Sequence, residues 1–253
     1  MYYLQTKASF DAAHFLWKYE GKCRNIHGHR WNVVFQIIEN ADTAILALQN
    51  GEVDAYQMTP QQVKKLDLDA SNLSTYSYSE GRVGYLEINC NRVTDEKVRK
   101  ALLYAMDRKA MDDAAFESSE YYSIPYTFLP TNSQFYTEDG VEKYEQDVDK
   151  AKSMLEDAGV SGLKLKLGYM SSDAVQSAQA LLIQEQLKEV GVTVELAGGD
   201  GTAIANAMKD PDNEYDMYLG GYIMGIDPDT FSSLFENDGA YNYMHYSGYD
   251  TID

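Results

Sequence analysis

The sequence predicts an α/β fold with a largely parallel or mixed sheet, flanking helices and a preceding N-terminal β-hairpin. Between residues 163 and 224, strand-like and helix-like segments alternate in the order β–α–β–α–β, which is typical of parallel strands joined by right-handed crossovers. Gly159 and Gly191 each follow a helical pattern at the position of a helix stop. Before residue 40, two segments rich in aromatic, small or β-branched residues flank a polar loop, which indicates a hairpin.

The individual elements follow from hydrophobic spacing and local stop signals. We expect strands at 2–10, 30–38, 83–91, 163–170, 192–196 and 215–224, and helices at 43–51, 95–116, 147–159, 172–191 and 202–210. The helix at 95–116 is predicted to be long, because Thr94 is a good N-cap and Val98, Leu102 and Met106 share one face. Ligands of such a sheet bind beyond the carboxyl ends of its strands, which here are the loops 170–172, 198–200 and 224–227.

Composition excludes several classes of function. The net charge of −19 disfavours binding to nucleic acid and to anionic membranes, because both carry phosphate. No apolar run approaches the roughly 20 residues of a membrane span, so no membrane span is expected. The first residues lack the features of a signal peptide, so the chain as written is expected to be cytoplasmic.

Charge is distributed unevenly between the two ends of the chain. Residues 1–38 carry five lysines and arginines against two acidic residues, which gives this segment a net charge of +3. Since the whole chain has a net charge of −19, the remaining residues carry −22. Such asymmetry suggests two segments with different origins or different roles. A basic arm on an acidic body is the simpler alternative.

Three of the four histidines lie in one stretch, FDAAHFLWKYEGKCRNIHGHRW, at residues 10–31. His27 and His29 are two residues apart and so share one face of a strand, and a hairpin could bring His14 beside them. Three neutral imidazoles with an open fourth position describe a catalytic zinc site. Cys23 could act near such a metal as a thiolate. Surface histidines on a hairpin are the alternative interpretation.

The motifs FDAAHFL and C-x-x-x-H-G-H resemble the start of the 6-pyruvoyl-tetrahydropterin synthase family, in particular its 6-carboxy-tetrahydropterin synthase branch of queuosine biosynthesis. The resemblance covers residues 1–37. It implies that His14, His27 and His29 bind zinc and that Cys23 is a catalytic base. The downstream proton relay and pterin anchor of the family are absent after residue 38, so a zinc-dependent lyase would be inactive.

Residues 38–253 resemble family-5 extracellular solute-binding proteins, the oligopeptide and dipeptide receptors of ABC transporters. The resemblance rests on successive blocks, among them TAILALQNGEVDAY, LEINCN, TDEKVRKALLYAMDRK, DVDKAKSMLEDAG, QEQLKEVGVTVEL and IDPDTFSSLF. It implies a periplasmic-binding-protein type II lobe that binds a peptide or small solute without catalysis and works with an ABC permease. Such relatives are extracytoplasmic, and this chain would be a truncated member.

The loop YIMGIDPD is the expected ligand-facing segment, with Tyr222, Met224, Asp227 and Asp229 as candidate ligand-binding residues. Relatives that bind a free peptide N-terminus have an aspartate a few residues before the D-P-D, and Met224 occupies that position. The resemblance therefore implies a blocked or non-peptidic solute as an alternative to a free peptide. Alternatively, Asp227 and Asp229 only cap a turn that opens a helix.

Three hypotheses follow for a chain divided into a zinc hairpin fragment at 1–37 and a binding lobe at 38–253. The first is a non-catalytic solute-binding lobe of an ABC importer. The second is a zinc-dependent tetrahydropterin synthase. The third is a fused product without an evolved function, which would have a poorly packed hairpin and exposed apolar surface.

Overall fold

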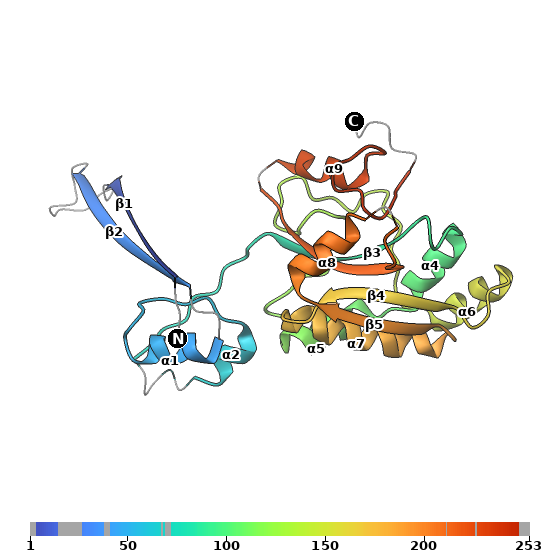
Figure 1. The fold of residues 1–253 in the computed structure, drawn as a ribbon, viewed down its shortest axis with the longest axis horizontal. Coiled ribbons are helices and arrows are strands. Elements are labelled where there is room, and N and C mark those ends of the chain that lie inside the picture. The colour runs from blue at the N-terminus through green and yellow to red at the C-terminus, as the bar shows by residue number, and fades with distance from the viewer. Residues whose placement is uncertain are drawn as a thin grey trace. The chain divides into compact units, whose positions relative to one another are not determined.

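The computed structural model describes residues 4–14, 27–37, 41–66, 68, 72–210, 212–225 and 227–247. The chain divides into two compact units, Met1–Ser74 and Thr75–Asp253 (Figure 1). Within the described ranges, no helix is both long and apolar enough to cross a membrane.

The first unit contains the predicted hairpin and two helices. Strands β1 (Leu4–His14) and β2 (His27–Ile37) pair antiparallel, from Leu4 opposite Ile37 to His14 opposite His27, so both strands extend further toward the turn than predicted. Helix α1 (Ala41–Gln49) confirms the helix expected at 43–51. The short helix α2 (Pro60–Lys64) was not predicted. It begins at a capping box, in which the Thr59 hydroxyl accepts from the Gln62 amide and the Gln62 side chain accepts from the Thr59 amide.

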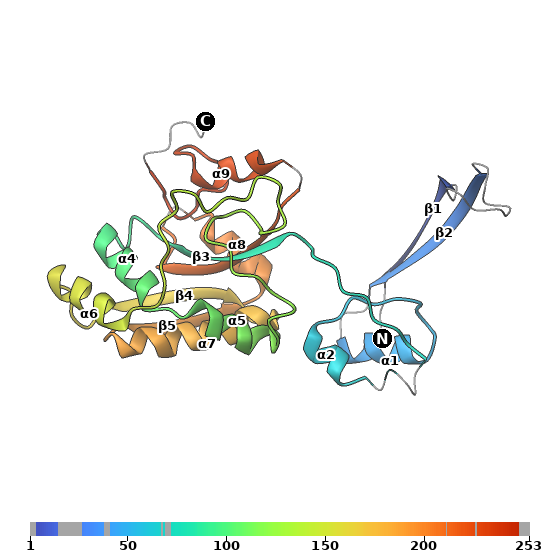
Figure 2. The same cartoon turned by 180° about the vertical axis from the view of Figure 1, so that it is seen from behind.

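The second unit is built on a four-stranded mixed sheet in the order β3-β6-β4-β5, which confirms the predicted fold class (Figures 1 and 2). Its strands are β3 (Arg82–Ile88), β4 (Lys164–Met170), β5 (Thr193–Gly199) and β6 (Met217–Ile223). Strand β4 pairs parallel with both β5 and β6, whereas β3 pairs antiparallel with β6. The parallel part follows from the two crossovers through α7 (Ala174–Glu189) and α8 (Gly201–Met208).

Helices cover both faces of this sheet. On one face the main core joins strand residues such as Leu167 and Met217 to α7 and to α4 (Glu96–Tyr104) and α6 (Val148–Asp157). The other face packs against α8 and the C-terminal segment, with Met244 completely buried. The C-terminal segment also contains a 3₁₀ turn at Pro228–Phe231 and the one-turn helix α9 (Ser232–Phe235).

The long helix predicted at 95–116 is wrong, because the structure divides it into α4 and α5 (Arg108–Phe116). Asp107 is the N-cap of the second helix, and its side chain accepts a hydrogen bond from the Ala110 amide at 2.9 Å. The Asp107 amide itself donates to the side chain of Gln186 on α7 at 3.0 Å. A short polar side chain that can cap a new helix therefore interrupts an apolar pattern that continues on both sides of it.

Candidate functional site

The candidate site is a cavity of about 520 Å³ at the edge of the sheet where β6 ends and the antiparallel β3 begins. Its volume lies within the range of roughly 300–1,000 Å³ that is usual for ligand pockets. Three segments far apart in the sequence line it: Ser79, Glu80 and Gly81; Pro130, Asn132, Ser133 and Gln134; and Met224 with Gly225.

Backbone contacts hold these segments together. The Met224 amide donates to the Gly81 carbonyl at 3.1 Å, which extends the pairing of β3 and β6 by one step. Gly81 has a φ of +66°, a conformation that glycine adopts without strain. The Asn132 side chain donates to the Ser79 hydroxyl at 2.9 Å and so ties the 130–134 loop to the start of β3.

Met224 adds an apolar residue to the mainly polar lining of the cavity. Met224 is only 8% exposed and packs in a small core with Leu129, Phe231 and Leu234. The Tyr222 ring lies on the Phe231 ring with 4.4 Å between the centroids. Convergent polar groups, here from Ser79, Asn132 and Gln134, fix the orientation of a ligand in a small-molecule site.

Large exposed apolar side chains flank the residues that line the cavity. Tyr78 precedes Ser79, Phe135 follows Gln134 and Ile223 precedes Met224, and all three are solvent-exposed. Exposed apolar groups beside a cavity are typical of a surface that contacts a ligand or another protein surface.

The predicted site residues of the YIMGIDPD loop divide between two roles. Met224 lines the cavity, and Tyr222 packs behind it through Phe231. Asp227 is an N-cap, because its side chain accepts from the Asp229 amide at 3.0 Å, and both aspartates are exposed. The capping interpretation of Asp227 is therefore confirmed, while a ligand contact of either aspartate stays a prediction.

One long ion pair, between Arg82 and Asp173, lies at this edge of the sheet. The Arg82 guanidinium lies 3.8 Å from the Asp173 carboxylate, and Asp173 also caps α7 through the Val175 and Gln176 amides. The Arg82 side chain lies close over Gly221, where any larger residue would collide with it. The absence of a side chain at Gly221 therefore leaves room for the guanidinium over β6.

A buried carboxyl lies further along β3, on the sheet face that α8 and the C-terminal segment cover. Glu87 is 8% exposed and stands opposite Tyr218 in the β3–β6 register. Burial raises the pKa of Glu87 to about 7. Burial also raises the pKa of Tyr85, Tyr218 and Tyr246, and the Glu87 charge raises each of them further. The carboxyl therefore changes its protonation state near neutral pH, whereas an exposed glutamate is ionised there.

The predicted zinc residues are described only in part. Cys23 lies outside the described residues, as do the side chains of His14, His27 and His29. The backbone register places His14 opposite His27, with His29 two residues further along β2. Cross-strand partners share one face of an antiparallel pair, so this register puts the three positions on one face of the hairpin. Elsewhere in the described ranges, no cluster of three metal-binding side chains occurs.

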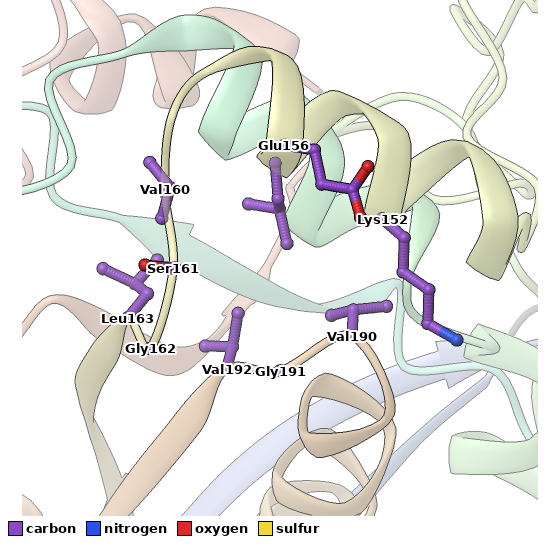
Figure 3. Close-up of a pocket in the computed structure, with 10 residues that line it drawn as sticks. Lys152, Glu156, Val160, Ser161, Gly162, Leu163, Val190, Gly191 and Val192 are labelled. Atoms are coloured by element: carbon purple, nitrogen blue, oxygen red, sulfur yellow. The ribbon is translucent and has the colours of Figure 1, made fainter.

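A second cavity, of about 230 Å³, lies at the opposite edge of the sheet (Figure 3). Val160, Val190 and Val192 line it, and Lys152 and Glu156 of α6 flank it. This edge carries the amino ends of β4 and β5. Ligands of parallel sheets bind at the carboxyl ends, so the larger cavity is the better candidate.

Several lining residues were not predicted from the sequence. The loops 170–172 and 198–200, expected at the site, lie at the same edge, joined by the Ser171 amide to the Gly199 carbonyl at 3.0 Å, but do not line the cavity. Residues 79–81 and 130–134 line it instead. The start of β3 could have been found only by recognising that β3 runs antiparallel, which puts its amino end beside the carboxyl end of β6.

Residues 30–243 match the model of the bacterial extracellular solute-binding proteins, family 5 middle region. The chain belongs to this family. It is 30% identical over 170 residues to a probable peptide ABC transporter periplasmic-binding protein, y4tO, of Sinorhizobium fredii, covering 65% of this chain and 32% of that protein. It is 26% identical over 238 residues to the oligopeptide-binding protein AppA of Bacillus subtilis, covering 86% and 42%.

Solved structures agree with this assignment. The ABC transporter substrate-binding protein CtaP of Listeria monocytogenes is 37% identical, with a TM-score of 0.80, over 87% of this chain and 45% of that one. The family-5 chain therefore spans less than half the length of these relatives. None of these matches supports the resemblance of residues 1–37 to a tetrahydropterin synthase.

Proposed function

We propose that this chain supplies one ligand-binding wall of a receptor that delivers a peptide or small solute to an ABC permease. The observation that carries the proposal is the cavity between β3, β6 and the 130–134 loop, at the carboxyl edge of the parallel strands. Its relatives include a probable peptide-binding and an oligopeptide-binding protein, which supports a peptide ligand. The proposal is for binding without catalysis, outside the cytoplasm, as the family description has it.

The chemistry of the lining suggests how a ligand would be held. Hydroxyl and amide side chains offer hydrogen bonds from the 79–81 and 130–134 segments, and Met224 offers an apolar contact. The only carboxylate among the lining residues is Glu80. A methionine where relatives carry an amine-binding aspartate favours peptides with a blocked N-terminus, or non-peptidic solutes, over free peptides.

Filling the cavity tests the proposal. A Cβ added at Gly225 meets nothing within 4 Å, so Gly225→Trp should occupy the cavity without disturbing the backbone. Ser161→Trp at the opposite cavity is the matched control. The probe is a random pentapeptide library, free or N-acetylated, and mass spectrometry identifies the peptides retained by the immobilised chain.

We expect the unmodified chain and Ser161→Trp to retain similar amounts of peptide. Gly225→Trp should retain at least tenfold less peptide than either. Preferential retention of the acetylated library would support the interpretation of Met224. Equal retention by Gly225→Trp, or none by the unmodified chain, would refute the cavity as the binding site.

We propose a second, separate property of the N-terminal segment: zinc binding by His14, His27 and His29. The pairing of His14 with His27 in the β1–β2 register supports it, because the register puts the three histidine positions on one face of the hairpin. Three histidines are the usual ligands of a zinc site with an open position. Cys23 would be the neighbouring thiolate of such a site. Elemental analysis should give about one zinc per chain, and the variant His27→Ala/His29→Ala should lose it; an equal zinc content in both would refute the assignment.

A further inference from the structure

In the described part of the chain, β1 and β2 form a sheet of two strands only. Each strand is 11 residues long, and among the described residues no third strand pairs with either of them. Isolated two-stranded hairpins are at best marginally stable in water, and a third strand or a packed face is usually required. Among the residues that the structure describes, the outer edge of β1 therefore presents backbone donors and acceptors that are open to pairing.

The two faces of the hairpin differ sharply. Phe10 lies opposite Trp31 on one face, and Phe35 lies on the same face; these side chains are 55%, 52% and 55% exposed. The other face carries Lys7, Ser9, Asp11 and Arg30. A large exposed aromatic group of this kind marks an interaction surface.

We propose that this hairpin pairs with the hairpin of a second copy of the chain, β1 against β1 in antiparallel orientation, with a two-fold axis at Ser9. The result is a four-stranded sheet in which the two β1 strands are central. It satisfies the free edge of β1 in both copies at once, as an isologous interface requires.

Charge complementarity selects this register. With the axis at Ser9, Lys7 lies directly opposite Asp11 of the second copy, and the same contact occurs twice. Within its own chain, Lys7 makes no ion pair among the described residues, whereas Asp11 pairs with Arg30 at 2.9 Å. Opposite charges on directly facing residues stabilise an antiparallel pair. A shift of the axis to a neighbouring residue of β1 removes both contacts.

The apolar face remains continuous in this arrangement. Phe10 lies opposite Ala8 of the second copy, so a large side chain faces a small one. The two Phe10 residues become diagonal neighbours across the axis, at a separation that aromatic side chains can bridge. The equivalent pairing of two β2 edges about Asn32 would place Arg30 opposite Val34 and gain no ion pair.

The overall charge of the chain also favours contact through the hairpin. Residues 1–38 carry a net charge of +3, whereas the rest of the chain carries the balance of the total of −19, which is −22. Two copies repel each other through their acidic bodies. The basic hairpin is therefore the segment through which they approach at the lowest electrostatic cost.

A charge-exchange experiment tests the register. Variant A is Lys7→Glu, and variant B is Asp11→Lys combined with Arg30→Glu, which keeps an opposite charge beside position 11 within the hairpin. Either variant alone would bring like charges together at both contacts. An equimolar mixture of A and B would restore opposite charges at both.

Sedimentation equilibrium of the full chain should show a dimer for the unmodified protein. Each single variant should dimerise about tenfold more weakly, since like charges on facing residues are destabilising, and the mixture should recover the original affinity as a heterodimer. A monomeric unmodified chain, unchanged dimers of the variants or no recovery on mixing would each overturn the proposal.

Disulfide trapping gives a second readout of the same axis. Only the residue on the axis faces its own copy, so Ser9→Cys, with Cys23 and Cys90 replaced by serine, should form a covalent dimer on oxidation. Ala8→Cys in the same background should not, because its facing residue is Phe10. Equal trapping at both positions would overturn the register.

Discussion

Replacing Glu87 with glutamine should change how the stability of the second unit depends on pH. The carboxyl is 8% exposed and faces Tyr218 across the β3–β6 pair. The other titratable groups of this region are Tyr85 and Arg82 on β3, Tyr222 on β6, Tyr246 in the C-terminal segment and Cys90 in the turn after β3. Burial raises the pKa of Glu87 from its ordinary value of 4.5 to about 7.

The sign of the effect follows from which state holds the proton. Below pH 4.5 both the folded and the unfolded chain carry it, and the free energy of unfolding is unaffected. Between pH 4.5 and about 7 the unfolded chain loses the proton and the folded chain keeps it, so stability falls as pH rises. Above that range the folded chain contains a buried charge, and the full penalty is about 3 kcal/mol.

Glu87→Gln keeps the shape of the protonated side chain and cannot ionise. Urea denaturation followed by far-ultraviolet circular dichroism should show the variant and the parent equally stable at low pH, and the variant more stable by about 3 kcal/mol above neutral pH. Glu189→Gln, which removes an exposed carboxylate on α7, is the control and should not change the pH profile. A parallel decline of the Glu87→Gln variant and the parent would refute the reasoning.

Three further changes test the packing. Asp107→Ala removes the N-cap of α5 and should lower the free energy of unfolding, measured in urea, by about 1 kcal/mol. An unchanged free energy would mean that this cap does not stabilise the start of α5. Leu167→Ala, at a fully buried position of β4, should cost about 3 kcal/mol, whereas Leu181→Ala at an exposed position of α7 should cost less than about 0.5 kcal/mol. Gly220→Ala should lower the melting temperature, because the added Cβ would collide with the Tyr85 ring, and the cost should be about 1–3 kcal/mol; an unchanged melting temperature would contradict this packing.

Local chemistry made part of the fold predictable. Gly159 and Gly191 follow α6 and α7 with φ values of +68° and +81°, as the stop signals indicated. The same kind of reasoning failed at Asp107, because apolar spacing continues through the break and only the Gln186 contact from α7 shows that the chain turns there. The spacing of apolar residues along the chain cannot predict a contact with a helix residue that lies 79 residues further on.

The site was predictable only where it lies on the alternating part of the chain. Met224 follows a parallel strand, and the carboxyl-edge rule therefore located it. The 79–81 and 130–134 segments are brought to it by an antiparallel strand and by the contact between Asn132 and Ser79, neither of which leaves a sequence pattern. Exposure of the hairpin face is similarly a property of the assembled unit, since aromatic strands usually indicate burial.

The most direct test of the central proposal is to map a bound peptide onto the backbone. The amide resonances of the ¹⁵N-labelled chain are recorded while an N-acetylated random pentapeptide mixture is added. Binding at the carboxyl edge predicts shifts at Gly81, Ser133 and Gly225, with none at Gly162 or Gly191 beside the opposite cavity. Shifts confined to the opposite edge, or no shifts at either edge, would contradict it.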